Sequence, residues 1–312
     1  MEKSKKGYIY IALAGTIWST LGLFGTVLME RGLSSEQVAF TRLFIGFIVL
    51  FAYTGVKNRN LLKLNLKGII YCAAIGIICQ GIFNMCYFKA VEKAGVSAAA
   101  VLLYTSPLFL AVFSGIIYKE KITKLKVVSL MVCFAGAFMA VTGGKLDFQG
   151  LSSYGIIMGI MAAVTYALMG IISRKALEDF SSETILIYGF LFGAFFMIPS
   201  AKPVEMLSLA SDPMTFIFMM LLGIFPAAIA YIFYAKGIAS NTELSVVGVV
   251  ASIELIIASF IGWIIIGEVF TIGKLLGVFM MFMSATMALQ TGNQEENSSE
   301  YEKTFEYVDE RI

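Results

Sequence analysis

Long apolar runs separated by short polar breaks dominate the chain. Each run reaches about 18 to 23 residues, which is enough for a helix to cross the roughly 30 Å hydrocarbon core of a bilayer. Charged residues fall mainly in the breaks between the runs. The pattern predicts ten transmembrane helices, near residues 8–29, 37–55, 67–89, 96–118, 123–142, 153–173, 183–200, 214–236, 243–266 and 273–290.

The composition favours a membrane protein over a soluble fold. Hydrophobic residues make up 59% of the chain and charged residues 14%, against roughly 45–50% and about 25% in soluble domains. The apolar runs also lack the polar face that a soluble helix turns towards water. We therefore expect an all-α integral membrane protein whose surroundings are the lipid bilayer.

The distribution of lysine and arginine predicts the orientation of the helices. With the N-terminus inside, the inner segments carry 14 Lys and Arg before the C-terminal tail, and the outer segments carry six. Basic residues stay on the cytoplasmic side of inserted segments. We therefore expect a multi-pass protein of the cytoplasmic (inner or plasma) membrane with both termini in the cytoplasm, where residues 1–7 form a short N-terminal segment.

Residues 291–312 differ in character from the rest of the chain. From Gln294 to Ile312 there are seven acids, two bases and few apolar residues. Such a composition is typical of a disordered, solvated segment. We expect a disordered acidic cytoplasmic tail, and a motif that docks a partner is the alternative.

The second half of the chain repeats the first at an offset of about 148 residues. The stretch "YTSPLFLAVFSGIIYKEKIT" at 104–123 aligns with "SIELIIASFIGWIIIGEVFT" at 252–271, which pairs Glu120 with Glu268. Residues 8–142 and 153–290 then form two five-helix repeats, and the odd number of spans turns the second copy over in the membrane. Inverted repeats are typical of secondary transporters, whose solute site lies near the midplane between the halves. A duplicated helical scaffold without transport is the alternative.

Three short motifs give the chain a resemblance to a known family. They are "IWST" in the first span, "YTSP" followed by "KEKIT" in the fourth, and "IEL" followed by "GWIIIGE" in the ninth. With them the chain resembles the drug/metabolite transporter superfamily, in its ten-helix form with two EamA-type repeats, over residues 8–290. The resemblance implies a carrier for a small-molecule solute, with a central cavity and no ATP site.

One position departs from the pattern of that family. Pro107 predicts a helix kink in the fourth span, because proline removes a backbone hydrogen bond. The ninth span commonly reads Glu-Pro in the family, whereas this chain has Glu254 followed by Leu255. The missing proline puts a matching kink in the ninth span in doubt.

Glu254 is the acid farthest from any predicted span end. It lies about nine residues into its helix, which at a rise of ~1.5 Å per residue is roughly 12–14 Å deep. Acids inside a membrane usually mark ion, proton or substrate paths, and burial favours the protonated form of a carboxyl group. We expect Glu254 to bind the solute and to serve as the proton-coupling residue; a protonated glutamate that only joins two helices is the alternative. Glu120 and Glu268 lie at span ends, where contact with water and headgroups is expected.

Aromatic and polar residues at similar depth complete the candidate site. Trp18 and Tyr166 occupy corresponding positions of the two repeats, and Gln80 and Asn84 share one helix face. Ring faces attract cations where water is excluded, so one carboxylate among several rings favours a solute with a cationic nitrogen. Each of these residues could also serve packing alone. The candidate substrate-binding residues are Glu254, Trp18, Tyr166, Tyr104, Ser106, Asn84, Gln80, Tyr87 and Tyr231.

Arg42 is the basic residue that falls inside a predicted span, about five residues from the outer end of the second. We expect it at the outer mouth, where it either attracts an anionic group or extends its guanidinium to the interface. Because this depth differs from that of Glu254, the two side chains are not expected to hold one solute together.

Other chemistries find little support in the residues. The chain has no histidine, and Cys72, Cys79 and Cys86 recur at a spacing of seven, as small packing residues on one helix face do. No metal site, bound cofactor, ATP-binding motif or nucleic-acid partner is expected. Glycine pairs four residues apart predict close helix packing, at 155/159, 189/193 and 273/277, and the last pair could instead support a homodimer.

The sequence thus predicts a secondary active transporter that works by alternating access, with proton coupling or exchange. Its solute would be a small nitrogen-containing metabolite, namely an amino acid, an amine or a quaternary ammonium compound. Metabolite export and uptake of a choline-like organic cation remain open alternatives. A membrane-embedded enzyme is not expected, because one mid-membrane acid without histidine offers no catalytic arrangement, and a sensor or scaffold acting through the tail is the third class.

Overall fold

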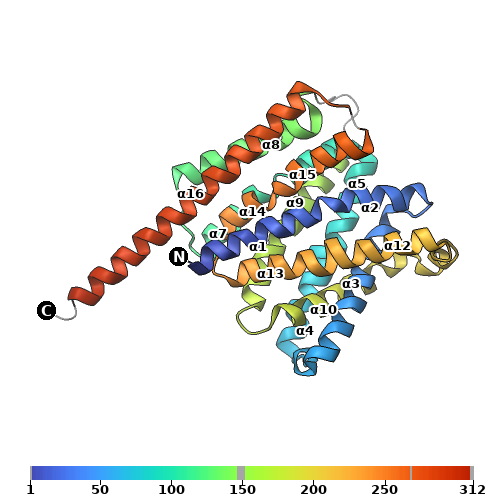
Figure 1. The fold of residues 1–312 in the computed structure, drawn as a ribbon, viewed down its shortest axis with the longest axis horizontal. Helices are drawn as coiled ribbons and strands as arrows, with labels where there is room; N and C mark the ends of the chain where they lie inside the picture. Colours follow the sequence, from blue (N-terminus) through green and yellow to red (C-terminus); the bar gives the residue numbers. More distant parts are fainter. Residues whose placement is uncertain (1, 146–151, 268, 310–312) are drawn as a thin grey trace.

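Membrane-spanning helices pack into a bundle from which the last helix, α16, extends (Figure 1). The structure is a computed structural model that describes residues 2–145, 152–267 and 269–309. In these ranges every regular element is helical. The predicted all-helical class and its ten spans are confirmed, with ends that agree to within a few residues: Ser4–Glu30, Ser35–Lys57, Leu66–Ala94, Ser97–Ile117, Lys124–Thr142, Ser153–Ala176, Ser182–Ala201, Pro213–Ala239, Leu244–Ile265 and Ile272–Gln290.

Several spans are single continuous helices. They are α3 (Ser35–Lys57), α8 (Lys124–Thr142), α9 (Ser153–Ala176), α10 (Ser182–Ala201) and α16 (Ile272–Asp309). The backbone of α16 stays helical as far as Asp309, through the tail for which the sequence predicts disorder. Short helices lie in the connections: η1 (Arg59–Leu62), η3 (Pro203–Met206) and α11 (Leu207–Ala210).

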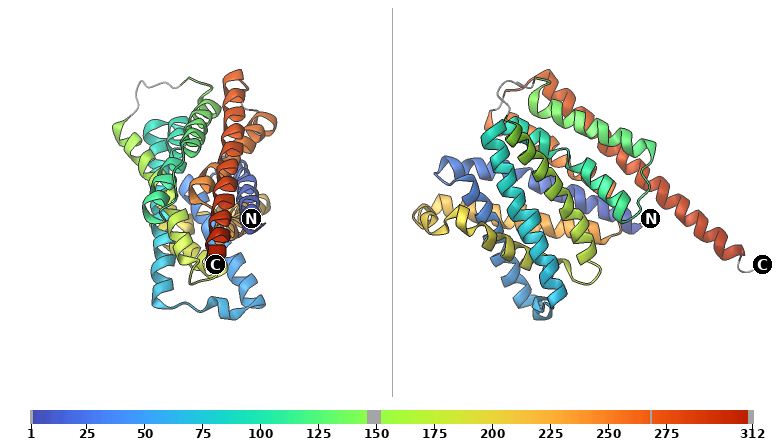
Figure 2. Two further views of the ribbon diagram at one scale, coloured as in Figure 1. Left: turned by 90° about the vertical axis from the view of Figure 1, so that its left-hand side faces the viewer. Right: turned by 180° about the vertical axis from the view of Figure 1, so that it is seen from behind.

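The helices α8 and α16 lie side by side (Figures 1 and 2). Glycines allow the close approach, because a Cβ added at Gly277 would meet Ala140 N at 2.1 Å and one at Gly273 would meet Gly143 O at 2.3 Å. The predicted packing role of this glycine pair is confirmed. Its alternative use in a homodimer is wrong, because α8 already covers both glycines.

The remaining spans in the described ranges are interrupted. The first consists of α1 (Glu2–Trp18) and α2 (Thr20–Glu30), and the fourth of α6 (Val96–Leu103) and α7 (Ser106–Ile117). The third and eighth each hold a stretch of wider π-helix between two α-helices: α4 (Leu66–Ala73), η2 (Ala74–Ile82) and α5 (Phe83–Ala94), and α12 (Pro213–Leu222), η4 (Gly223–Ile229) and α13 (Ala230–Ala239). The ninth consists of α14 (Leu244–Ala251), α15 (Ile253–Ile261) and η5 (Gly262–Ile266).

The interruptions recur in the two halves of the chain. The π-helical stretch of the third span has its counterpart in the eighth, and the break before α7 has its counterpart before α15. At the first break Thr105 N donates to Leu102 O at 3.1 Å, and at the second Ser252 N donates to Val249 O at 3.2 Å. The same tight turn therefore forms in both spans.

The doubt raised by the missing proline is resolved by this geometry. Pro107 lies in the first turn of α7, directly after the break, where its lack of an N–H leaves no helical hydrogen bond unmade. In the ninth span Leu255 N donates to Ser252 O at 3.1 Å, and the chain breaks without a proline. The ninth span therefore breaks at a turn around Ser252 and needs no proline to do so.

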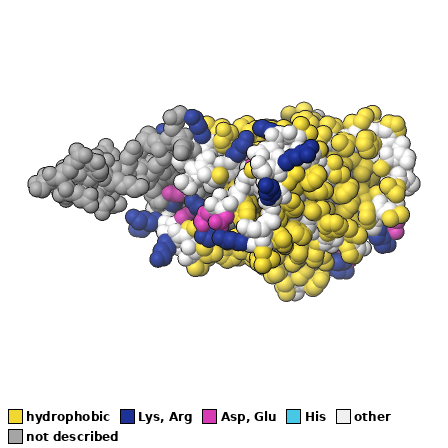
Figure 3. Space-filling view, turned by 90° about the horizontal axis from the view of Figure 1, so that it is seen from below, with side chains coloured by type: hydrophobic (Ala, Val, Ile, Leu, Met, Phe, Trp, Pro, Cys, Tyr) yellow, Lys and Arg dark blue, Asp and Glu magenta, His cyan; other side chains and the backbone are white. Residues whose placement is uncertain are grey.

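The surface suits a bilayer. In the view from below, hydrophobic side chains cover a broad area, while Lys and Arg side chains gather towards the end from which α16 extends (Figure 3). Many large apolar side chains are exposed on the molecule, among them Ile116, Ile264 and Phe279 at 72%, 78% and 59%. An apolar belt of this kind faces lipid in a membrane protein.

Candidate functional site

Helix interruptions lie at the candidate site residues. Trp18 ends α1, Gln80 belongs to η2, and Tyr231 follows η4. Tyr104 stands in the break between α6 and α7, and Glu254 is the second residue of α15. Irregular backbone inside a membrane is tolerated where it is buried in protein or lines a cavity. Discontinuous helices build the solute sites of many transporters in this way.

A chain of hydrogen bonds links Arg42, Gln80 and Tyr231 in the interior. Arg42 Nη2 donates to Gln80 Oε1 at 3.2 Å, and Gln80 Nε2 donates to Tyr231 Oη at 2.8 Å. Asn84 Nδ2 donates to the backbone oxygen of Gln80 at 2.5 Å. All four side chains are buried. This network joins the second, third and eighth spans and therefore both halves of the chain.

The position of Arg42 differs from the expected outer mouth. A capping box of Ser34 and Gln37 starts α3 at Ser35, so that Arg42 lies about two turns inside the helix. Its side chain is only 7% exposed and turns to Gln80 in the interior. The expectation of an exposed mouth residue is wrong, because a partner on another span holds the guanidinium within the bundle.

Trp18 joins the first span to the eighth beside this network. Its Nε1 donates to Pro226 O in η4 at 3.0 Å. Its ring centroid lies 5.1 Å from that of Tyr231, edge to face at 72°, and 5.2 Å from that of Tyr234. The indole thus packs against the phenol that receives the hydrogen bond of Gln80.

Glu254 is surrounded by tyrosines from other spans. Its charge acts on the hydroxyls of Tyr87, Tyr104, Tyr166 and Tyr231, which belong to the third, fourth, sixth and eighth spans. Glu254 is partly exposed, as are the first three of these tyrosines. Because its neighbours come from so many spans, this exposure faces an internal space and not lipid.

Two further observations concern the surroundings of Glu254 and of the Arg42 network. Within the described ranges no hydrogen bond or ion pair engages the Glu254 carboxylate, while Arg42 lies close enough for the two charges to act on each other. A small cavity reaches Gln80 and Tyr231 from the side of α9 and α10, where Ser173 and Phe190 line it. Ser106, also predicted for the site, is buried at the start of α7, and in the described part of the chain its hydroxyl has no hydrogen bond to the other candidates.

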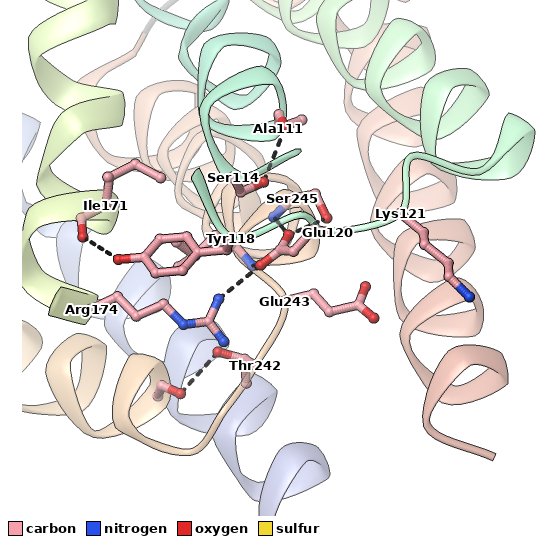
Figure 4. A network of polar contacts seen from close by, with 12 residues as sticks. Ala111, Ser114, Tyr118, Glu120, Lys121, Ile171, Arg174, Thr242, Glu243 and Ser245 are labelled. Atoms are coloured by element: carbon pink, nitrogen blue, oxygen red, sulfur yellow. Dashed lines mark hydrogen bonds and ion pairs between the residues drawn. The ribbon is translucent and has the colours of Figure 1, made fainter. Parts of the chain in front are cut away.

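A polar cluster that the sequence analysis missed joins the segment after α7 to the start of α14 (Figure 4), at the end of the bundle where Glu243 N contacts Tyr8 Oη. Glu120 accepts hydrogen bonds from Leu244 N at 2.9 Å, from Ser245 N at 3.1 Å and from Ser245 Oγ at 3.0 Å. Arg174 Nη1 lies 2.8 Å from Glu120 Oε1, and its guanidinium stacks 4.9 Å from the ring of Tyr118. Glu120 therefore caps α14 of the second half from the first half.

Neighbouring contacts close the same end. Lys126 Nζ, on a side chain 2% exposed, pairs with Glu243 Oε2 at 2.8 Å, and Glu243 N donates to Tyr8 Oη at 3.1 Å. We call the cluster of Tyr8, Glu120, Lys126, Arg174, Glu243 and Ser245 the end latch. The expected contact of Glu120 with water and headgroups is wrong, since its side chain is 9% exposed. Its repeat mate Glu268 lies outside the described residues.

Ten candidate membrane spans, paired helix interruptions and a buried polar centre are typical of membrane transporters, and the family that the chain matches is one of transporters and not of enzymes. The chain belongs to the EamA-like transporter family, whose model matches residues 5–142 and 153–290. The family model thus matches twice, once in each half, in agreement with two repeats.

Several proteins resemble the chain over most of its length. A protein of Clostridium kluyveri named "Uncharacterized transporter" is 28% identical, with 90% of this chain and 92% of that protein covered. The "Uncharacterized inner membrane transporter YicL" of Salmonella typhimurium is 19% identical over 92% and 96%. One solved structure shares the fold at a TM-score of 0.77 and 18% identity, over 94% of this chain and 99% of that one.

A shorter match comes from a protein whose name states a solute. The "S-adenosylmethionine uptake transporter" of Rickettsia bellii is 26% identical over 169 residues, which are 54% of this chain and 56% of that protein. The relatives therefore agree on transport.

Proposed function

We propose that the protein is a secondary active transporter of a small nitrogen-containing metabolite in the cytoplasmic membrane, and that Glu254 is the countercharge of its solute. The observation that carries the proposal is an unpaired carboxylate in an internal space, surrounded by tyrosines from several spans. Tyrosine faces and a carboxylate together attract a cationic nitrogen where water is excluded. The relative named for S-adenosylmethionine uptake supports a nitrogen-containing solute.

Alternating access is supported by the contrast between the closed end and the internal space. The end latch ties the two halves together at the end for which the Lys and Arg count predicts a cytoplasmic location. Solute can pass that end only if Glu120 releases α14. The end latch then serves as the cytoplasmic gate of an outward-facing or occluded state.

Proton coupling follows from the same carboxylate. If the solute and a proton compete for Glu254, each binding event displaces the other, and the two fluxes are linked. Uptake of a choline-like cation is the second candidate, and the tyrosines around Glu254 favour it, because aromatic rings recognise quaternary ammonium groups.

The test is flux in liposomes that contain the purified protein. Wild type is challenged with amines, quaternary ammonium compounds and neutral amino acids, and both transient currents and internal pH are recorded. The substitution Glu254→Gln is expected to weaken the active solute class by at least about tenfold, since it removes a desolvated countercharge, and to abolish its proton flux. Glu178→Gln is the control, because Glu178 is exposed and pairs with Lys175. Unchanged flux and unchanged pH dependence in Glu254→Gln would overturn the proposal.

A further inference from the structure

Arg42 is a buried cation with unused hydrogen-bonding capacity. Its Nη2 donates to Gln80, whereas its Nε is buried and has no hydrogen-bond partner. In the ranges that the structure describes, no carboxylate lies within ion-pairing distance of its guanidinium. Buried polar groups in proteins are nearly always satisfied, so one left open indicates a ligand or a functional role.

Glu254 is the carboxylate whose charge interacts with that of Arg42. The two charges act on each other, and Tyr231 feels both. They are nevertheless too far apart to form an ion pair, and neither has another partner of opposite charge among the described residues. A positive and a negative group thus border the same interior and remain unpaired there.

Gln80 holds the guanidinium in place. Its Oε1 accepts from Arg42 while its Nε2 donates to Tyr231, and its backbone oxygen accepts from Asn84. These contacts fix the amide, and the amide in turn fixes one edge of the arginine. A guanidinium presents its remaining N–H groups as a planar fork that matches a carboxylate.

We propose that Arg42 is the anion-binding pole of the solute site, so that the transported solute carries a carboxylate or a similar anionic group in addition to its cationic nitrogen. This inference rests on the proposed function, in which the nitrogen faces Glu254. A solute with both charges would pair with Arg42 and Glu254 at once and would satisfy both. The sequence-based expectation that the two residues act at separate depths is replaced by one dipolar site.

A competing explanation assigns Arg42 a structural role, in which its charge merely offsets that of Glu254. The two explanations differ in what they require of the solute. A structural arginine is indifferent to an anionic group on the solute, whereas an anion-binding arginine discriminates by it.

The experiment uses pairs of solutes that differ only in the anionic group. Glycine betaine is compared with choline, and a neutral amino acid with the amine left by its decarboxylation. Binding to the purified full-length protein is measured by the shift in its unfolding temperature, and flux is measured in liposomes. Wild type is expected to prefer the carboxylate member of a pair by at least about tenfold, as sites built to bond one polar group do.

The variants assign this preference to Arg42. In Arg42→Gln the two members of a pair are expected to bind within about twofold of each other, and Arg42→Lys is expected to keep part of the preference. Gln80→Met keeps the arginine but removes the amide oxygen that accepts its hydrogen bond, and it is expected to lower the preference about threefold or more. This variant tests the inference if Arg42→Gln does not fold. Arg31→Gln is the control, because Arg31 pairs with Asp212 on the surface.

Two results would overturn the dipolar site, and they affect the proposed function differently. Equal binding of choline and glycine betaine, unchanged in Arg42→Gln, leaves the proposed function standing and makes Arg42 structural. Binding of carboxylates that lack nitrogen, dependent on Arg42, would keep the anion pole but remove both the dipolar solute and the nitrogen-containing metabolite of the proposed function.

Discussion

Glu120 of the first repeat accepts a hydrogen bond from the backbone N–H of Leu244, a residue 124 positions further along the chain. The same carboxylate pairs with Arg174 and accepts from Ser245. A negative charge at the first turn of a helix satisfies free N–H groups and complements the helix dipole. One side chain therefore links the segment after α7 to α9 and α14.

The substitution Glu120→Ala should open this end. It removes the acceptor of the N–H groups that start α14 and leaves Arg174 without its carboxylate, at a cost of about 1–3 kcal/mol. Ser114 is fully buried beside Glu120, so a cysteine placed there in a chain without its native cysteines reports access from water. We expect Ser114→Cys to react with a thiol reagent several times faster in Glu120→Ala than in the parent.

The matched control is Lys121→Ala, whose side chain Figure 4 shows directed away from Glu120. It should leave the labelling rate at position 114 unchanged. Equal labelling in Glu120→Ala and the parent would show that Glu120 caps a helix without gating access.

The ion pair of Lys126 with Glu243 should behave as a unit. Lys126 is 2% exposed and Glu243 is 21% exposed, so removal of one partner leaves a charge in a poorly solvated place. We expect Lys126→Met to cost about 1–3 kcal/mol, because partial exposure of Glu243 screens part of the effect. Adding Glu243→Gln should recover part of that loss. Unfolding temperatures of the single and double variants in detergent measure the coupling.

The exposed pair of Lys175 with Glu178 supplies the comparison, since surface pairs contribute about 0–1 kcal/mol. Lys175→Met should therefore lower the unfolding temperature little. If the Lys126 and Glu243 variants lower it additively, the two side chains are not coupled.

The fold was predictable because its signals are local. Apolar runs of membrane-crossing length gave the spans, and glycine pairs such as Gly273 and Gly277 marked a close helix contact. The break before α15 was harder to predict from the sequence, because the proline common in the family is absent and a turn at Ser252 stands in its place. Signals of that kind depend on what packs around the backbone, which the sequence alone does not display.

The site was predictable only in part, for a related reason. Residue type and depth singled out Trp18, Gln80 and Tyr231, which the structure joins in one cluster. Arg42 was assigned to the mouth because distance from a span end does not reveal its partner on another span. The contacts of Glu120 join residues more than fifty positions apart. Such contacts exist only in the assembled bundle.

The close contact between α8 and α16 should not tolerate a side chain at Gly277. A Cβ at Gly277 would lie 2.1 Å from backbone nitrogen, which cannot move aside, so Gly277→Ala should cost about 1–3 kcal/mol through overpacking. Gly22→Ala is the matched control, because nothing lies within 4 Å of the added carbon. The unfolding temperature in detergent should fall for Gly277→Ala and stay level or rise for Gly22→Ala. An unchanged unfolding temperature in both variants would mean that α8 and α16 move apart to accept the added carbon without loss of stability.

Trp18 should affect stability and solute binding separately. Trp18→Phe keeps a ring beside Tyr231 but leaves the Pro226 carbonyl without its indole donor, which should cost about 1 kcal/mol. Tryptophan attracts cations better than phenylalanine, so the solute should also bind several times more weakly.

Trp263→Phe is the control, because that ring contacts Phe260 and Phe270 and has no hydrogen bond in the described part of the chain. Solute titrations monitored by unfolding temperature measure both effects. A lower unfolding temperature with unchanged solute affinity would mean that Trp18 stabilises the packing of the first span against the eighth and lies outside the solute site.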